Sequence, residues 1–148
     1  MDKLTQQHSL SFVLPEPASV KSDQKWAITL GPKGKLHTYE GDRVVVHDNQ
    51  VVIYPGLQPQ WVVLNFNHAV ANVEAGHYKI VPSDDEYAER EGRVRVGGVY
   101  GEEGINNSWN GVLTLNKDDS GKFTISFGCE SEYKGEWEIK NCEIIFSL

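Results

Sequence analysis

Short runs of β-branched and aromatic residues recur along the whole chain, and Gly, Pro, Asn, Asp or Ser separates each run from the next. Runs of this length and composition are typical of β-strands, and turn signals at such regular spacing indicate an all-β domain. We expect strands at residues 10–14, 25–30, 35–39, 43–47, 50–54, 61–66, 77–81, 93–100, 109–116, 122–127, 134–140 and 143–148.

The predicted strands fit a single-domain antiparallel β-sandwich with Greek-key or jelly-roll-like connections, and a closed up-and-down β-barrel around a small ligand is the alternative. Both architectures cover one apolar face of a sheet and hide strand edges. A chain of 148 residues can bury a core as one unit, so we assign residues 1–148 to a single all-β domain. We expect residues 1–8 to be a flexible amino-terminal segment, and we expect one short helix at 83–92.

A two-residue turn at Asp48 and Asn49 joins two strands that are rich in valine. Both residue types tolerate the positive φ that such turns require. The turn sets the register of the hairpin and places Val46 opposite Val51. Because the two strands are apolar on both faces, we expect a central hairpin that is covered on two sides.

A second hairpin is predicted around a five-residue loop at 117–121. This loop places Leu115 opposite Phe123 and Leu113 opposite Ile125, so that one face of the hairpin is wholly apolar. We expect that face to lie in the core.

The last hairpin is predicted to turn at Asn141 and Cys142, with the cysteine at a position where glycine is favoured. This register places Lys140 opposite Glu143, whereas a turn one residue earlier would bring two glutamates face to face, which destabilises a strand pair. We therefore expect Cys142 to be an exposed turn residue. Cys129 would then lie at the other end of the sheet, on the order of 20 Å away.

Two cysteines at that separation cannot form a disulfide, because bridged Cα atoms lie within about 7 Å of each other. Unbridged cysteines fit a reducing compartment. The amino-terminal sequence has no signal peptide, so we expect a cytoplasmic location, although a signal peptide that had already been trimmed would leave the same sequence.

The net charge of −7 arises entirely in the second half of the chain. Residues 1–80 contain seven acidic and seven basic side chains, whereas residues 81–148 contain fourteen acidic and seven basic ones. Nucleic acids and anionic membranes bind basic surfaces, so this distribution argues against both as partners. It favours a protein partner with a basic surface.

The sequence contains no pattern that is typical of catalysis or of metal binding. Histidine pairs with zinc-ligand spacing, a serine-hydrolase elbow and a phosphate-binding glycine loop are all missing. Each cysteine is followed by a glutamate, and a negative neighbour disfavours the reactive thiolate. We therefore expect no catalytic residue, no metal ion and no cofactor, and a protein that is not an enzyme.

The leading functional prediction is a non-enzymatic protein-binding module, such as an inhibitor or a toxin-neutralising protein, that acts through its acidic second half. Charge complementarity would steer and orient a basic partner. The carboxylates expected to bind the partner are Glu102, Glu103, Glu130, Glu132, Glu136 and Glu138.

The alternative prediction is a domain that binds a small ligand or a carbohydrate through exposed aromatic side chains. An indole ring beside amide groups is typical of sugar sites. Trp61 follows a Pro- and Gly-rich segment and is expected to be the exposed tryptophan, and the stretch "INNSWNG" places a second tryptophan among amides. The candidate ligand-binding residues are Trp61, Trp109, Asn106, Asn107 and Asn110.

Overall fold

The computed structural model describes residues 24–55, 61–82, 92–100, 103–105, 108–131 and 137–148. The strand predicted at 10–14, the segment 1–8 and almost all of the helix predicted at 83–92 lie outside these residues. Within them the chain is all-β, as predicted. The strands are β1 (Lys25–Pro32), β2 (His37–Gly41), β3 (Val44–His47), β4 (Gln50–Ile53), β5 (Trp61–Asn65), β6 (Gly76–Val81), β7 (Arg93–Tyr100), β8 (Glu103–Ile105), β9 (Ser108–Lys117), β10 (Lys122–Ser131) and β11 (Trp137–Ser147), with one 3₁₀ turn, η1 (Val70–Asn72), between β5 and β6.

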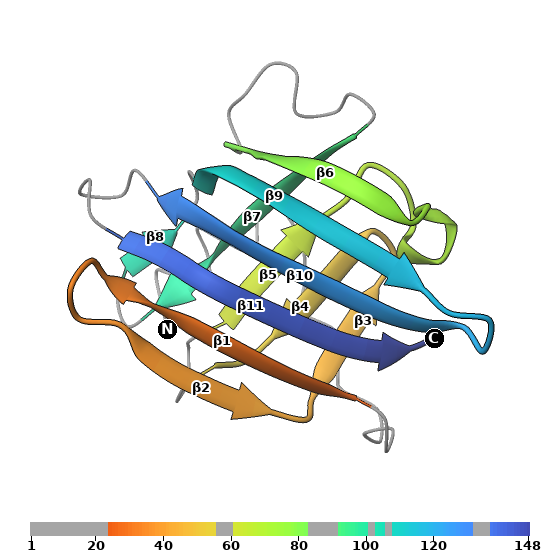
Figure 1. Cartoon of the computed structure of the whole chain (residues 1–148), viewed down its shortest axis with the longest axis horizontal. Helices are drawn as coiled ribbons and strands as arrows, with labels where there is room; N and C mark the ends of the chain where they lie inside the picture. The colour runs from red at the N-terminus through yellow and green to blue at the C-terminus, as the bar shows by residue number, and fades with distance from the viewer. Residues whose placement is uncertain (1–23, 56–60, 83–91, 101–102, 106–107, 132–136) are drawn as a thin grey trace, which may run out of the picture.

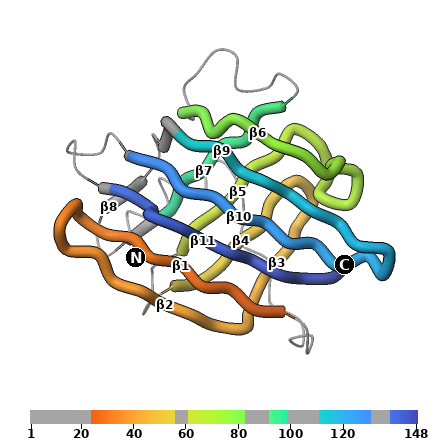
Figure 2. The backbone as a smooth tube through the Cα atoms, in the orientation of Figure 1, coloured from red at the N-terminus to blue at the C-terminus, as the bar shows by residue number. Residues whose placement is uncertain are grey.

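All of these strands belong to one sheet, in the order β2-β1-β11-β10-β9-β6-β7-β5-β4-β3, and β8 pairs with β7 beside this path. The β6–β7 pair is parallel, and every other pair is antiparallel. The sheet curls so that its two halves face each other (Figures 1 and 2). We call β2, β1, β11, β10, β9 and β6 the front layer, and β7, β5, β4 and β3 the rear layer. The structure therefore encloses its core as a sandwich does, with one curled sheet in place of two.

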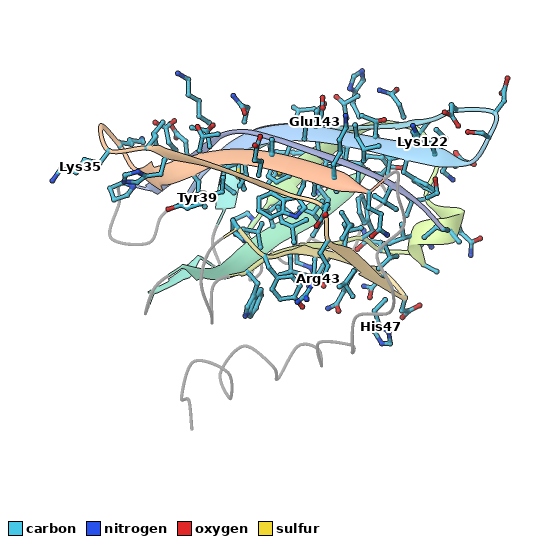
Figure 3. All side chains as sticks on the ribbon, turned by 90° about the horizontal axis from the view of Figure 1, so that it is seen from below. Lys35, Tyr39, Arg43, His47, Lys122 and Glu143 are labelled. Carbon is cyan, nitrogen blue, oxygen red and sulfur yellow. The ribbon has the colours of Figure 1, made fainter. Side chains whose placement is uncertain are left out.

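The core fills the space between the two layers (Figure 3). Alternate residues of the strands point into it, which is the two-residue period that the sequence shows. The front layer contributes Ile28, Leu113 and Phe146, and the rear layer contributes Ile53 and Leu64, all of them at most 1% exposed. Burial of these aliphatic and aromatic side chains is the main stabilising term, at about 25 cal/mol for each Å² of apolar surface removed from water.

The turn predicted at Asp48 and Asn49 is confirmed. Val46 pairs with Val51, and the flanking pairs follow in the predicted register. Asp48 has a φ of 54°, the only positive φ at a non-glycine position in the described residues. The hairpin is covered on both faces, but it is not central, because β3 is the last strand of the rear layer. An edge strand buried on both faces is unusual, and it indicates that a further segment covers it.

The hairpin around residues 117–121 is present, but its register differs by one residue on each strand. Leu115 pairs with Ile125 and not with Phe123. The reason is the side chain of Asp118. Its Oδ1 accepts hydrogen bonds from the backbone N–H of Ser120 at 2.9 Å, from the hydroxyl of Ser120 at 2.7 Å and from the backbone N–H of Lys122 at 2.9 Å. These bonds make Asp118 the first residue of the loop and lower the pKa of its carboxyl.

The last predicted hairpin is wrong. Residues 137–147 form one continuous strand, β11, which pairs with β1 on one edge and with β10 on the other. Asn141 and Cys142 are not a turn. Cys142 lies opposite Ile28 of β1 and opposite Phe127 of β10, and its side chain is 1% exposed.

A β-bulge at Lys140 and Asn141 produced the pattern that resembled a turn. Ile139 and Cys142 both point into the core, and the two residues between them point to solvent. The register shifts at this place against both neighbouring strands, as it must when one strand carries an extra residue. On β10 the bulge faces Gly128, where an added Cβ would lie 2.7 Å from the carbonyl oxygen of Lys140, so only glycine fits without a shift.

Both cysteines therefore lie in the same core on neighbouring strands, and the predicted separation of the two across the sheet is wrong. Cys129 is 5% exposed, and no disulfide joins it to Cys142. Burial raises the pKa of the Cys142 thiol well above its usual range, and the proximity of Cys129 and Glu143 raises it further.

Replacing Cys142 by glycine is expected to lower the free energy of unfolding by about 2 kcal/mol. The change removes a buried side chain, leaves a cavity, and adds glycine to a strand interior. Urea unfolding of Asn141→Gly is the matched control, because this neighbour is exposed, and it should lose less than about 1 kcal/mol. A Cys142→Gly variant as stable as the native protein would contradict the burial of this thiol.

Stability is expected to fall with rising pH because of Cys142. The unfolded thiol ionises at its ordinary pKa of about 8.5, whereas the folded thiol keeps its proton at that pH, so the stabilisation is complete below this pH and is lost above it. Between the pKa of the unfolded thiol and that of the folded thiol, the free energy of unfolding of the native protein should fall by about 1.4 kcal/mol per pH unit. The Cys142→Ala variant should lack this contribution to the fall. Denaturant titrations of both proteins from pH 7 to 10 measure this difference, and parallel curves would refute it.

Candidate functional site

Two of the predicted partner-binding carboxylates, Glu130 and Glu138, lie directly opposite each other on β10 and β11. Their neighbours Cys129 and Ile139 are in the core, so both carboxylates project to the solvent side of the front layer. Facing like charges destabilise a strand pair, and Lys33 offsets this, with its Nζ 3.2 Å from Glu130 Oε1. Because Lys33 and Glu130 are nearly half exposed, their ion pair contributes less than about 1 kcal/mol.

The other four predicted carboxylates are described only in part. Glu103 lies in β8, where its backbone pairs with Tyr100, and its side chain is not described. Glu102, Glu132 and Glu136 lie outside the described residues.

The strand register nevertheless relates the described strand ends that border these positions. Ser131 pairs with both Ser108 and Trp137, so these ends of β9, β10 and β11 lie side by side at one edge of the front layer. Since only residues 106–107 separate β8 from β9, β8 also ends beside that edge.

A second group of carboxylates surrounds Ala27, near the opposite end of the same solvent face. Ala27 pairs with Glu40 of β2 on one side and with Glu143 of β11 on the other. Strands lie about 4.8 Å apart, so the Cα atoms of the two glutamates are about 10 Å apart across the small alanine. These residues, with Asp42 and Lys25, line a groove of about 580 Å³. Figure 3 shows Glu143 directed away from the rear layer.

Both groups of carboxylates lie on one side of the front layer, which we call the acidic face. Along β11, Glu138 and Glu143 are separated by about 15 Å. Lysines accompany these carboxylates on the same side, and the local excess of negative charge lies around Ala27, where Glu40, Asp42 and Glu143 are accompanied by Lys25. The acidic face carries Glu40, Asp42, Glu130, Glu138 and Glu143, and the lysines on the same side of the front layer are Lys25, Lys33, Lys79, Lys122 and Lys140.

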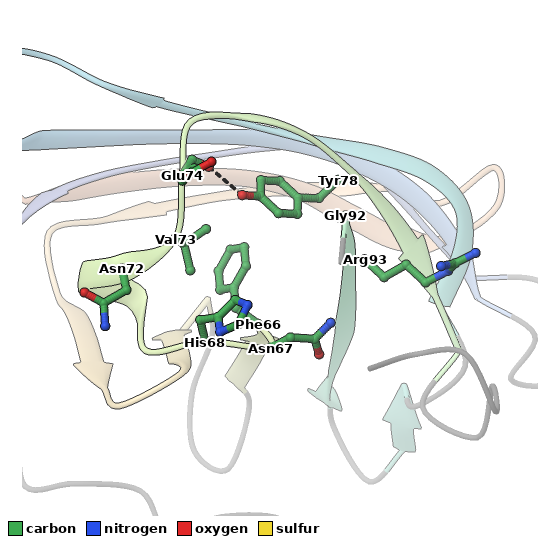
Figure 4. Close-up of a pocket in the computed structure, with 9 residues that line it drawn as sticks. All are labelled: Phe66, Asn67, His68, Asn72, Val73, Glu74, Tyr78, Gly92 and Arg93. Carbon is green, nitrogen blue, oxygen red and sulfur yellow. Dashed lines mark hydrogen bonds between the residues drawn. The ribbon is translucent and has the colours of Figure 1, made fainter. Parts of the chain in front are cut away.

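A separate pocket of about 260 Å³ lies where the sheet passes from β6 to β7 (Figure 4). Phe66 and Tyr78 form its aromatic wall, with ring centroids 5.8 Å apart in an edge-to-face arrangement. The Tyr78 hydroxyl donates a hydrogen bond to the backbone carbonyl of Glu74, which fixes the ring. Such a fixed aromatic pair can receive an apolar or planar part of a small molecule.

Polar side chains complete this pocket on the sides that the rings leave open. Asn67 and His68 follow β5, Asn72 belongs to η1, and Arg93 begins β7. In Figure 4 the amide of Asn67 and the imidazole of His68 lie near Phe66, and the guanidinium of Arg93 points away from the rings. Hydrogen-bond donors and acceptors beside an aromatic wall are the usual composition of a site for a small polar ligand.

Trp61 is the one predicted ligand-binding residue whose side chain the structure describes, and it does not line this pocket. Trp61 is 7% exposed, so the expected exposure of this side chain is wrong. Its indole packs with Val52 and Val63, which face away from the core. For Trp109 and Asn110 the structure describes the backbone of β9 alone, and Asn106 and Asn107 lie outside the described residues.

Sequence reasoning did not find the Phe66–Tyr78 pocket. Its residues come from the segment after β5, from β6 and from the start of β7, and no local spacing connects them. Taken one at a time in the sequence, the residues that line the pocket have the character of ordinary strand and turn residues. A pocket of this kind becomes visible only when the pairing of distant strands is known.

In the described residues, no group of three or more His, Cys, Asp or Glu side chains is arranged to hold a metal ion. The same part of the chain contains no helix with the length and apolar composition needed to cross a bilayer. The chain matches no protein-family model, no curated protein and no solved structure.

Proposed function

We propose that this chain is a non-enzymatic protein-binding module, acting as an inhibitor or a toxin-neutralising protein, and that a basic partner binds to its acidic face. The observation that carries the proposal is the groove in which Glu40 and Glu143 flank Ala27. Two carboxylates on either side of a small residue form a receptor for a lysine or arginine side chain.

The residues of the groove can bind both the methylene stem and the cationic group of a lysine or arginine side chain. Ala27 and Ile145 offer an apolar floor on which the methylene stem of a lysine or arginine can lie. The carboxylates beside them can accept charge-assisted hydrogen bonds from its cationic group. Lys25 at the rim would repel a second cation, which favours one inserted side chain at this position.

Glu130 on β10 and Glu138 on β11 add a second pair of carboxylates to the acidic face. A partner that contacts both ends of the acidic face would have basic side chains about 15 Å apart, the separation of Glu138 from Glu143. Charges arranged in this way increase the rate of encounter and orient the partner, and their effect weakens with salt. A cytoplasmic location agrees with the two buried thiols, which form no disulfide.

The test is affinity capture from a lysate of the native host, at low and at moderate salt, with the intact protein as bait. A specific partner should be recovered at low salt and should be depleted at moderate salt. The double variant Glu40→Gln/Glu143→Gln should weaken its binding roughly tenfold, since loss of one good charge contact costs about 1.4 kcal/mol.

A matched control removes the same amount of charge away from the acidic face. Glu74→Gln/Asp119→Asn changes two exposed carboxylates on the segment after β5 and on the β9–β10 loop. This control should capture the partner as the native protein does. Equal capture by both double variants, or recovery of no partner at either salt concentration, would contradict the proposal.

A second candidate function is the binding of a small polar molecule in the Phe66–Tyr78 pocket. The specific observation is the fixed edge-to-face pair beside Asn67, His68 and Asn72. The pocket volume of about 260 Å³ is at the small end for ligand sites, so the molecule would have the size of a monosaccharide or an amino acid.

Screening by NMR with monosaccharides and with small aromatic carboxylates tests this candidate. A ligand should shift the side-chain resonances of Phe66 and Tyr78, and Tyr78→Ala should abolish the shifts. His77→Ala is the matched control, because His77 lies on the same strand on the exposed side, with its Nδ1 2.9 Å from Thr114 Oγ1. Shifts that persist in Tyr78→Ala, or that are absent for all compounds, would exclude this pocket as the site.

A further inference from the structure

The rear layer carries a second group of buried apolar residues, on the side that faces away from the core. We call Val45, Val52, Trp61 and Val63 the rear apolar face. Figure 3 shows that His47 points away from the front layer. Val45 lies two residues earlier on the same strand and therefore on the same side.

These side chains are buried although they lie on the outside of a two-layer structure. Val52 is 0% exposed, Val63 is 3% exposed, and Val45 and Trp61 are each 7% exposed. In the part of the chain that the structure describes, the apolar residues that pack with them come from β3, β4 and β5, together with Tyr54. Neighbours in the same sheet cannot bury the outer side of a strand completely, so a further layer must cover this face.

Polar atoms on the same side show what kind of segment is required. Gln50 is 3% exposed, and its Nε2 donates to Asn65 Oδ1 at 2.8 Å. Its Oε1 is buried without a hydrogen-bond partner, and so is the Nε of Arg95 two strands away. A buried acceptor without a donor is destabilising, so the covering segment should bring an N–H or O–H group to Gln50.

The path of the chain brings one segment to this place. Trp26 pairs with Gly41 at the end of β2, and its indole N–H donates to the carbonyl oxygen of Arg43 at 3.1 Å, immediately before β3 begins. The chain that precedes Gln24 therefore enters beside the start of β3. Residues 15–23 can span about 30 Å when extended, which exceeds the roughly 10 Å width of the three strands.

The composition of that segment matches the face. Its longest apolar run is "LSFVL" at residues 10–14, in which Leu10, Phe12 and Leu14 alternate with Ser11 and Val13. An extended run of this pattern presents Leu10, Phe12 and Leu14 on one side, and Ser11 and Val13 on the other. The backbone N–H groups of such a run are donors of the kind that Gln50 requires.

We propose that residues 10–14 dock on the rear apolar face of the same chain and form a third layer over β3, β4 and β5. The docked run buries Val52 and Val63 and donates a hydrogen bond to Gln50. It also covers the edge hairpin, which leaves the acidic face as the open side of the sheet. The proposal does not depend on the proposed function, because it concerns the opposite side of the molecule.

Paramagnetic relaxation in the intact chain tests the docking. A spin label on Ser11→Cys reacts at that position alone in the folded protein, since Cys129 and Cys142 are buried. The label should strongly broaden the methyl resonances of Val52 and Val63. Val112 is the internal control, because it is 56% exposed on the solvent side of β9, and it should keep its intensity. Unchanged intensities at Val52 and Val63 would overturn the proposal.

A mixture of two kinds of chain identifies the chain that supplies the segment. One kind carries the spin label without isotope labelling, and the other is isotope-labelled without a spin label. Docking within one chain predicts no broadening in the mixture, whereas broadening at Val52 would show that a second copy supplies the segment and would overturn the proposal.

A further measurement compares two double variants in the intact chain. Phe12→Asp/Leu14→Asp should lower Tm and increase the fluorescence of a dye that binds apolar surfaces, and Gln6→Asp/Gln7→Asp should do neither. Equal behaviour of the two variants would show that another part of the molecule covers the face.

Discussion

The pairing of β11 on both of its edges is the constraint on which the rest of this structure depends. β11 ends the chain, yet it lies in the middle of the front layer, with β1 on one side and β10 on the other. Among the described strands, β1 joins the rest of the sheet through β11, and β2 joins it through β1. If β11 did not pair with β1, neither strand would be attached to the sheet. The bulge at Lys140 and Asn141 lets one strand of eleven residues follow the curl of the sheet while Ile139, Cys142 and Ile144 all remain in the core.

The two layers differ in what they can offer to other molecules. The front layer has a buried side and a solvent side, so its outward residues are available for recognition. The rear layer is buried on both sides around Val52, so its strands serve the packing of the protein. The carboxylates that we propose as the partner-binding surface lie on the solvent side of the front layer, from Glu40 on β2 to Glu130 on β10. The pocket at Phe66 and Tyr78 lies between the two layers, where β6 passes to β7.

Much of the fold could be predicted from the sequence because strand signals are local. The runs of Val, Ile, Phe and Trp gave nearly every strand of the described residues, and the turn at Asp48 was predicted because its residue types fit a positive φ. The same local signals failed at Asn141, since a bulge and a tight turn both interrupt the alternation of apolar residues. What decides between them is the partner strand β1, more than a hundred residues earlier in the chain.

The candidate sites were predicted less well, for the same reason. Glu130 and Glu138 were selected by charge alone, and the sequence could not show that they face each other. The groove at Ala27 joins β2, β1 and β11, and it could not be found before the pairing of these strands was known. Trp61 was expected to be exposed because it follows a loop, but its position on the rear apolar face buries it.

The position of β11 is tested most directly by nuclear Overhauser effects between backbone protons at Cys142. Our account predicts cross-strand effects from Cys142 to Ile28 on β1 and to Phe127 on β10, the two partners that flank it. A hairpin that turns at Asn141 and Cys142 would give effects between Ile139 and Ile144, and would give none from Cys142 to Ile28. Observation of that second pattern would contradict the continuous strand and, with it, the arrangement of the whole front layer.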